Sequence, residues 1–266
     1  TLFFKAFFKQ PFNIIVSGLK GSFRKAVSIA LASYFGKRYI NRGFLMCSLV
    51  YLLLEDIDNG SSIDLNDQEQ VAAHLQTISE DKGRINYHKE PVEINGQNIA
   101  TAKVGPRSLR EHIKFTIDGK SGNRELFYAI AAYPAVNKVI ERLLRDLSQD
   151  GMVLRITEPC AWKNAVNVML LADVSARAKR SREAIGALEN WDRVTNKEDF
   201  GPGRYPAIKL IAIATDEMTS RQAYLKARRT ILLRSNRLSA FILKLTSSPI
   251  LSPEEMDANL LSRVKA

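Results

Sequence analysis

Apolar residues recur every three or four positions through much of the chain, and this spacing predicts amphipathic helices. The pattern is clearest within the segment 105–147, where one helical face would hold Leu126, Phe127, Ile130, Ala131, Val136, Val139, Ile140, Leu143, Leu144 and Leu147. Pro134 lies inside the pattern. It predicts that one helix ends and another begins there, because proline lacks a backbone donor. We expect this segment to form the middle of the molecule.

Five further segments carry helix signals. We expect helices over 22–35 and 42–54, a helix that begins near 64–67 with Val71, Ala72, Leu75 and Ile78 on one face, an amphipathic helix over 162–178, and one or two helices within 216–245. The run 44–54 is the most hydrophobic of the chain. Its 11 residues are fewer than the roughly 20 that span a bilayer, so we predict a buried core helix.

Strand signals are fewer and shorter. Between 85 and 103, two short runs flank Asn95-Gly96, a dipeptide that favours a tight hairpin turn. The segment 152–156 is predicted to be a short strand. The segment 201–206, Gly-Pro-Gly-Arg-Tyr-Pro, is predicted to be a loop.

Because helix signals dominate, the predicted fold class is mainly α. We expect two helical lobes, a small β-hairpin in the N-terminal lobe, and extended terminal arms. The predicted bounds are 1–20 for the N-terminal arm, 21–147 for the N-terminal lobe, 148–246 for the C-terminal lobe and 247–266 for the C-terminal arm.

The composition describes a globular and strongly basic protein. Of 266 residues, 45% are hydrophobic and 25% are charged, and the formal net charge is +11. The first 54 residues contain eight cations and no aspartate or glutamate, whereas the segment 55–80 is rich in acids. We interpret those acids as a solvated face and not as a metal or glycosidase pair. The excess of positive charge favours an anionic polymer or surface as the partner.

Residues for catalysis are scarce. The three histidines, His74, His88 and His112, have no nucleophile or acid at a recognised catalytic spacing, and Cys47 and Cys160 each stand alone in apolar company. We therefore predict buried free thiols and a reducing compartment, and we expect no enzymatic activity, no cofactor and no metal site. No nucleotide fingerprint is present, since no Gly-Lys-Ser/Thr follows the glycines of 201–206. The sequence begins at Thr1 and not at methionine, so further N-terminal residues are left open.

Three basic segments are the candidate nucleic-acid contacts. The first is the stretch after Gly105, where cations lie on a partly apolar segment. The second directly follows the predicted helix 162–178, and the third is a run of seven cations without acids over 221–244. The predicted RNA-binding residues are Arg107, Arg110, Lys114, Arg177, Lys179, Arg180, Arg182, Arg221, Lys226, Arg228, Arg229, Arg234 and Arg237.

Both ends of the chain carry short apolar segments. Phe3, Phe4, Phe7 and Phe8 form one helical face beside Lys5 and Lys9, and Leu260 and Leu261 belong to an amphipathic C-terminal tail. Segments this short cannot bury their own apolar face. For the N-terminal arm we weigh a partner subunit, the protein's own core and a membrane surface, and we predict that the arms serve oligomerisation.

The central stretch resembles the nucleocapsid proteins of segmented negative-strand RNA viruses, the bunyavirus group, most nearly the tospovirus and orthobunyavirus type. The similar residues are Arg107-Ser108-Leu109-Arg110-Glu111-His112-Ile113 with Lys114-Phe115-Thr116-Ile117, followed by Ile130-Ala131-Ala132-Tyr133-Pro134. The resemblance covers about 40 residues. It implies a helical, two-lobed protein that holds single-stranded RNA in a basic groove and builds multimers through its arms.

The sequence thus predicts a viral nucleoprotein that encapsidates single-stranded genomic RNA. Homo-oligomerisation follows from the arms, a viral polymerase is a further candidate partner, and the expected location is the virion and the host cytoplasm. Binding would neutralise phosphates with little sequence preference. Two alternatives come from other classes: a viral matrix or peripheral membrane protein, and a DNA-binding replication protein.

Overall fold

A computed structural model describes residues 12–89, 92–118, 122–162, 164–180, 208 and 210–234. Residues 1–11 of the predicted N-terminal arm, the C-terminal arm, the loop 201–206, Arg182 and Arg237 lie outside the described residues, and so do the predictions made for them. Residues 13–18 of the predicted arm form a buried strand and not an extended arm.

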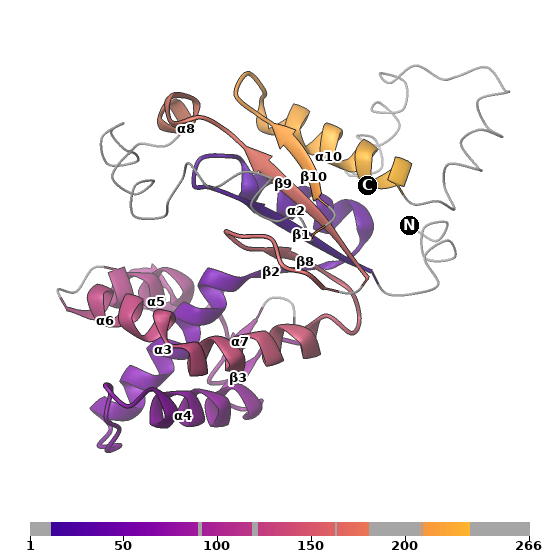
Figure 1. The fold of residues 1–266 in the computed structure, drawn as a ribbon. Coiled ribbons are helices and arrows are strands. Elements are labelled where there is room, and N and C mark those ends of the chain that lie inside the picture. Colours follow the sequence, from indigo (N-terminus) through magenta and orange to yellow (C-terminus); the bar gives the residue numbers. More distant parts are fainter. Residues whose placement is uncertain are drawn as a thin grey trace, which may run out of the picture.

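A five-stranded parallel sheet lies at the centre of the molecule (Figure 1). Its strands are β1 (Asn13–Gly18), β2 (Arg38–Asn41), β8 (Met152–Arg155), β9 (Ala165–Leu171) and β10 (Leu210–Ala214), in the order β10-β9-β1-β8-β2. β1 pairs with β8 on one side and β9 on the other. Each residue of β1 is buried, as expected for the middle strand of a parallel sheet with both faces covered. The fold is therefore α/β, and the mainly α prediction was wrong.

Two helices cover one face of the sheet, α2 (Arg24–Phe35) and α10 (Ser220–Arg234). Their apolar residues join the side chains of β1, β8, β9 and β10 in one buried cluster, with Val27 and Leu31 from α2 and Ala227 and Ile231 from α10. The prediction of a helix over 22–35 is confirmed.

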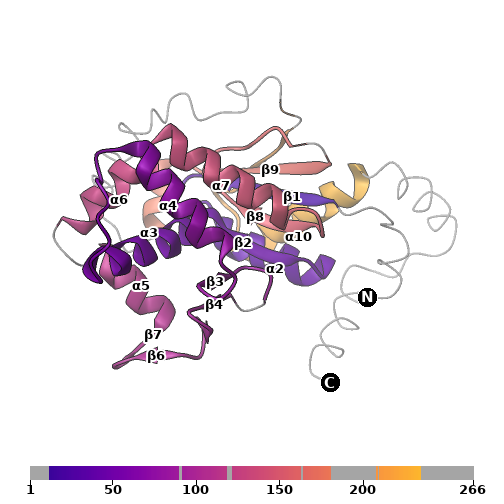
Figure 2. The ribbon, with the colours of Figure 1, turned by 90° about the horizontal axis from the view of Figure 1, so that it is seen from below.

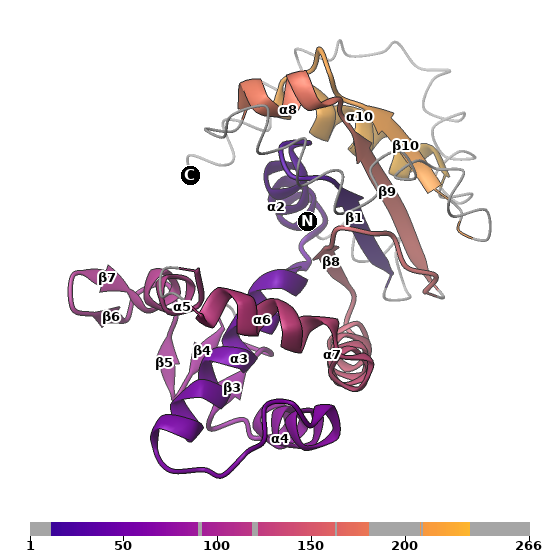
Figure 3. The same ribbon diagram turned by 60° about the vertical axis from the view of Figure 1, so that its left-hand side comes forward.

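The chain between β2 and β8 forms a helical layer on the other side of the sheet. It contains α3 (Arg42–Asp58), α4 (Gln68–Glu80), α5 (Leu109–Asp118), α6 (Asn123–Ala132) and α7 (Pro134–Leu147). Figures 1 and 3 show these helices gathered below the sheet, and Figure 2 shows α4 and α7 in front of it. The sheet therefore takes strands from chain segments on both sides of this layer, and so from both of the lobes expected from the sequence.

The helical layer shares an apolar core with the face of the sheet that it covers, which contributes Ile15, Ile40 and Leu154. α3 is buried along most of its length, as predicted for the run 44–54, and α4 buries Val71, Ala72, Leu75 and Ile78, the predicted face. Pro134 is the first residue of α7, as its position in the pattern predicted. Among the described residues, no helix is both long enough and apolar enough to cross a membrane.

Short hairpins link α4 to α5. β3 (Ile85–Asn86), β4 (Glu93–Ile94) and β5 (Gln97–Asn98) form one small sheet, and β6 (Lys103–Val104) and β7 (Arg107–Ser108) form another. Asn95 and Gly96 connect β4 to β5 and both have positive φ, the geometry of a type I′ turn. The hairpin prediction is confirmed.

The predicted helix over 162–178 was wrong. This segment forms the strand β9 and then the short helix α8 (Val174–Arg180). Val166 to Leu171 are apolar except for Asn167, and periodicity alone does not distinguish a buried strand from a buried helix in so short a run. Pairing with both β1 and β10 decides the outcome, because it satisfies the backbone groups of β9 from both sides.

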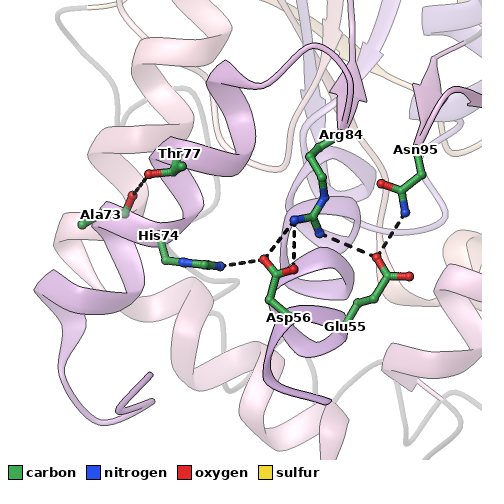
Figure 4. A network of polar contacts seen from close by, with 7 residues as sticks. All are labelled: Glu55, Asp56, Ala73, His74, Thr77, Arg84 and Asn95. Carbon is green, nitrogen blue, oxygen red and sulfur yellow. Dashed lines mark hydrogen bonds and ion pairs between the residues drawn. The ribbon is translucent and has the colours of Figure 1, made fainter. Parts of the chain in front are cut away.

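A network of ion pairs and hydrogen bonds connects elements of the helical layer (Figure 4). Asp56, on α3, contacts His74 Nε2 on α4 at 2.7 Å and Arg84 Nη1 at 2.9 Å. Glu55 accepts a hydrogen bond from Asn95 Nδ2 at 3.1 Å and lies 3.6 Å from Arg84 Nη2. The network joins α3, α4 and the β4–β5 turn, and we call it the Asp56 network.

Candidate functional site

The order of the strands singles out one edge of the sheet. All five strands are parallel, so their carboxyl ends meet at the same edge. From β1 the chain passes through α2 to β2 on one side, while β9 and β10 lie on the other side. In open α/β sheets, ligands bind outside the carboxyl ends of the strands where the connections diverge in this way. The candidate site is therefore the region beyond the end of β1.

A glycine-containing loop, residues 18–23, connects β1 to α2. Gly18 has φ +139°, and a Cβ there would lie 2.4 Å from Leu170 O, at the end of β9. Gly21 has φ +87°, and a Cβ there would lie 2.7 Å from the Cβ of Arg177 on α8. Only glycine fits these two positions, because both the backbone angles and the neighbouring atoms exclude a side chain. The loop is thus pressed between β9 and α8.

Hydrogen bonds hold this loop in shape. Ser22 donates from its backbone N and from Oγ to Leu19 O, and Gly18 N donates to Thr157 O at 3.0 Å. Phe23 precedes α2 with φ +66°, and within the described chain its side chain does not cap the helix. Because the loop 18–23 follows the carboxyl end of β1, α2 starts at the carboxyl edge of the sheet. Its N-terminus carries partial positive charge.

Two arginines of α8 attach the loop to the neighbouring strands. Arg177 is fully buried and its Nη1 lies 3.3 Å from Lys20 O. Arg180 donates to Thr215 O and to Asp216 O, and its guanidinium lies 4.1 Å from the centre of the Phe23 ring. Burial lowers the pKa of Arg180, while Asp216 and Asp173 act in the opposite direction. These two side chains position the loop.

Five cations gather around the carboxyl edge, and we call them the cation cluster: Arg24, Lys25, Arg110, Lys114 and Arg155. Arg24 and Lys25 begin α2, Arg155 ends β8, and Arg110 and Lys114 lie on α5. Partial burial lowers the pKa of Lys114, and the positive charges of Arg110, Lys25 and Arg155 lower it further. Burial lowers the pKa of Arg24 to about 10, with Arg155 and Arg177 contributing. Burial is the main cause of both pKa shifts, and neighbouring positive charges add to it.

The cluster has no anionic partner in the described part of the chain. Arg24 Nη1 donates to Ile156 O at 2.9 Å and to Thr157 Oγ1 at 3.2 Å, which are neutral acceptors. None of the five cations forms an ion pair with a carboxylate among the described residues. The exposed carboxylate of Glu111 also lies on α5, and its pKa is lowered chiefly by hydrogen bonds from Ser108 and in part by Lys114. The five cations still carry an excess of positive charge, which suits a bound polyanion.

A cleft of about 450 Å³ opens beside the cluster, between the ends of β2 and β8 and the helix α7. Arg24, Arg42 and Arg155 line it, together with Trp162 and Cys160, and two carboxylates, Glu141 and Glu158, also lie in its wall. Burial raises the pKa of the Cys160 thiol to about 11, and Glu141 adds to this. Because a thiol with a raised pKa is mostly protonated near neutral pH, Cys160 is a weak nucleophile here. The cleft can hold a ligand but offers little for covalent chemistry.

The structure separates the described RNA-binding candidates into four groups. Arg110 and Lys114 belong to the cation cluster, and Arg177 and Arg180 contact the loop 18–23, with Lys179 exposed beside them. Arg107 is exposed and lies 3.9 Å from the ring centre of Phe115. Arg221, Lys226, Arg228 and Arg229 lie on α10, which covers one face of the sheet. Arg234 ends the same helix.

Sequence reasoning missed Arg24, Lys25 and Arg155 as site residues. The available signal was the order strand, glycine loop, helix. Residues 13–17 read Asn-Ile-Ile-Val-Ser, Gly18 and Gly21 follow, and the predicted helix over 22–35 comes next. The sequence does lack the phosphate-loop pattern Gly-x-x-x-x-Gly-Lys-Ser/Thr, since Phe23, Arg24 and Lys25 stand at its last three positions.

Comparisons with known proteins give little guidance. No protein-family model matches the sequence, and a search of curated proteins finds no match. Among solved structures, TT1252 from Thermus thermophilus is similar over 85% of this chain and 99% of its own, with 13% identity and a TM-score of 0.39. A likeness of this size says nothing about what this chain binds.

Proposed function

We propose that this protein binds a phosphorylated small molecule of nucleotide size at the carboxyl edge of its parallel sheet. The observation that carries the proposal is the cation cluster, five basic side chains without a carboxylate partner in the described chain, beside the loop 18–23 and the start of α2. Phosphate oxygens match both the fork of arginine and the point charge of lysine. The proposal concerns binding and includes no reaction.

The shape of the site favours a small ligand. The cleft of about 450 Å³ is concave and within the usual range for small-molecule pockets, and Trp162 offers an apolar surface in its wall. The cations of the cluster come from three chain segments and converge on one edge of the sheet, whereas a surface that follows a polymer presents its cations in a row.

RNA encapsidation stays a prediction. It would draw on the exposed cations of α10, such as Lys226 and Arg229, which lie on a different helix from the cluster. The two functions share the predicted residues Arg110 and Lys114 but not the cations of α10, so substitutions on α10 can separate them.

Isothermal calorimetry on the whole chain at low salt tests the proposal. The probes are inorganic pyrophosphate, a nucleoside monophosphate, a nucleoside diphosphate and a single-stranded RNA oligonucleotide. We expect Lys25→Gln and Arg155→Gln each to weaken binding of the small phosphorylated probes about tenfold, because each removes a charge-assisted contact. Arg142→Gln is the matched control, since Arg142 is an exposed cation on α7 and outside the cluster.

Two results would contradict the proposal. One is that no phosphorylated small molecule binds the wild-type protein. The other is that binding is unchanged by Lys25→Gln and Arg155→Gln. RNA binding that falls in a Lys226→Gln, Arg229→Gln double variant, with no binding of pyrophosphate or nucleotides, would favour encapsidation instead.

A further inference from the structure

Exposed apolar side chains gather at one corner of the helical layer. Four large apolar side chains are exposed among the described residues, and three of them, Val104, Phe115 and Tyr128, belong to the β6–β7 hairpin, α5 and α6. Figures 2 and 3 show the hairpin at the outer end of the layer, beyond α5. A single exposed apolar side chain is ordinary, whereas three at one corner indicate a contact surface.

The hairpin holds its apolar tip beside Phe115. Val104 pairs with Arg107 across the two strands, so both side chains project from the same face of the hairpin. On that face, the guanidinium of Arg107 lies 3.9 Å from the centre of the Phe115 ring. The base of the hairpin is fixed, since Leu109 N donates to Ala102 O at 2.8 Å. Val104, Arg107 and Phe115 are therefore held together.

A second ring with a neighbouring cation lies on α6. The guanidinium of Arg124 lies 5.9 Å from the centre of the Tyr128 ring. The helices α5 and α6 are in contact, since Asn123 Nδ2 donates to Thr116 O at 2.8 Å. An exposed lysine, Lys103, precedes Val104 in the hairpin. We call the following residues the hairpin patch: Lys103, Val104, Arg107, Phe115, Arg124 and Tyr128.

Positive charge surrounds the apolar side chains of the hairpin patch. Its three cations are exposed, and Lys103 and Arg107 form no ion pair with a described residue. The exposed carboxylates described on the same elements are Glu111 and Glu125. Glu111 Oε2 accepts hydrogen bonds from Ser108 N at 3.0 Å and from Ser108 Oγ at 2.8 Å, and so it caps the start of α5. The patch thus combines apolar side chains with an excess of cations.

We propose that the hairpin patch docks the protein on an anionic phospholipid membrane. Val104, Phe115 and Tyr128 enter the boundary between headgroups and acyl chains, and the cations beside them contact the anionic headgroups. Arginine suits this boundary, because its stem packs on apolar surface while its charge stays at the polar end. The proposal does not rest on the proposed function, because no residue of the hairpin patch belongs to the cation cluster.

The form of the patch favours a membrane over a protein or an RNA strand. A stable protein interface buries about 800 Å² on each partner around a continuous apolar core, whereas this patch offers three apolar side chains with cations between them. A single strand of RNA stacks its bases on open aromatic faces, but Arg107 covers one face of the Phe115 ring and Val104 has no ring. A fluid bilayer accepts apolar side chains one by one.

Vesicle flotation of the whole chain at low salt tests the proposal. The probes are vesicles of phosphatidylcholine alone and vesicles of phosphatidylcholine mixed with phosphatidylserine, and we expect binding to the mixed vesicles only. The double variant Lys103→Gln, Arg107→Gln should bind them about thirtyfold more weakly, since each cation near an anionic surface contributes about fivefold. The matched control is Lys138→Gln, Arg142→Gln, which removes two exposed cations from α7.

A second double variant, Val104→Ser, Phe115→Ser, keeps the charge and removes apolar surface. It should bind the mixed vesicles about tenfold more weakly, because two apolar side chains no longer enter the membrane. Ile29→Ser is the control and should bind as the wild type does, since Ile29 is the fourth exposed side chain and lies on α2. All substituted positions are exposed, so each variant should unfold at the wild-type temperature by circular dichroism.

A tryptophan at the hairpin tip identifies the segment that touches the vesicle. Relative to the wild type, Val104→Trp should add fluorescence that shifts to shorter wavelength with mixed vesicles, and Ile29→Trp should not. Equal binding to both kinds of vesicle, binding to neither, or bound protein with no shift in Val104→Trp would overturn the proposal. So would RNA binding that falls in Lys103→Gln, Arg107→Gln without vesicle binding, which would make the patch an RNA contact.

Discussion

The Asp56 network and the cation cluster are both rich in charged side chains, but they differ in whether those side chains form ion pairs. In the network, Arg84 contacts the carboxylates of Asp56 and Glu55, and His74 contacts Asp56 (Figure 4). In the cluster, five cations share one edge of the sheet and have no carboxylate partner among the described residues. The ion pairs of the Asp56 network join α3 to its neighbours. The cations of the cluster have no ion pair in the described part of the chain, and we propose that a ligand compensates for them.

The difference separates structural charges from binding charges. An ion pair with several hydrogen bonds stabilises a fold when its members are partly shielded from water, as Asp56 is. A group of like charges lowers stability, so its presence in a fold points to a ligand that compensates for it. The predictions below test whether the two regions respond to substitution in opposite directions.

Breaking the Asp56 network should have the largest effect on stability. Asp56→Asn removes the carboxylate that His74 and Arg84 share and leaves Arg84 only the more distant Glu55, so we expect the free energy of unfolding to fall by about 1–3 kcal/mol. Urea denaturation followed by circular dichroism measures this. Asp58→Asn is the matched control, since Asp58 is exposed at the end of the same helix. If the two variants were equally stable, the Asp56 network would not contribute to the stability of the fold.

Removing a charge from the cluster should act in the opposite direction and more weakly. Lys25→Gln relieves repulsion with Lys114, so we expect the free energy of unfolding to rise by up to about 1 kcal/mol at low salt. The gain should disappear at high salt, where exposed charges are screened. Urea denaturation at both salt concentrations measures it. A loss of stability at low salt would mean that Lys25 has a counter-charge in the folded protein.

The third prediction concerns the pKa of Lys114, and it is the smallest and most local of the expected effects. Burial and the three neighbouring cations place its folded-state pKa below the ordinary value of 10.5. As the pH rises through this window, the folded state releases the proton first. The unfolded state then binds more protons, and the contribution of Lys114 to stability increases with pH. NMR titration of the side chain should show its pKa rising toward 10.5 in Lys25→Gln. An unchanged pKa would place Lys25 outside the cluster.

Local patterns in the sequence were sufficient for much of the helical layer. The apolar positions of α4 and α7 face the core, Pro134 begins α7, and Asn95-Gly96 forms the hairpin turn, because each depends on residues close together in the chain. The same patterns were insufficient for the sheet. β1 and β9 are short, mostly apolar and largely buried, and only hydrogen bonding with distant strands distinguishes them from helix.

The candidate site shows the same division. Its charges were visible in the sequence as a basic first segment and as the predicted contacts Arg110 and Lys114. Their assembly was not visible, because Arg24 and Lys25 come early in the chain, Arg110 and Lys114 come from its middle, and Arg155 ends a strand that follows the whole helical layer. The sequence by itself determined the helices of that layer, the hairpin and the sign of the charge. Only the tertiary structure decided which cations lie together, since parallel pairing of β1, β2 and β8 brings their carboxyl ends, far apart in sequence, to one edge of the sheet.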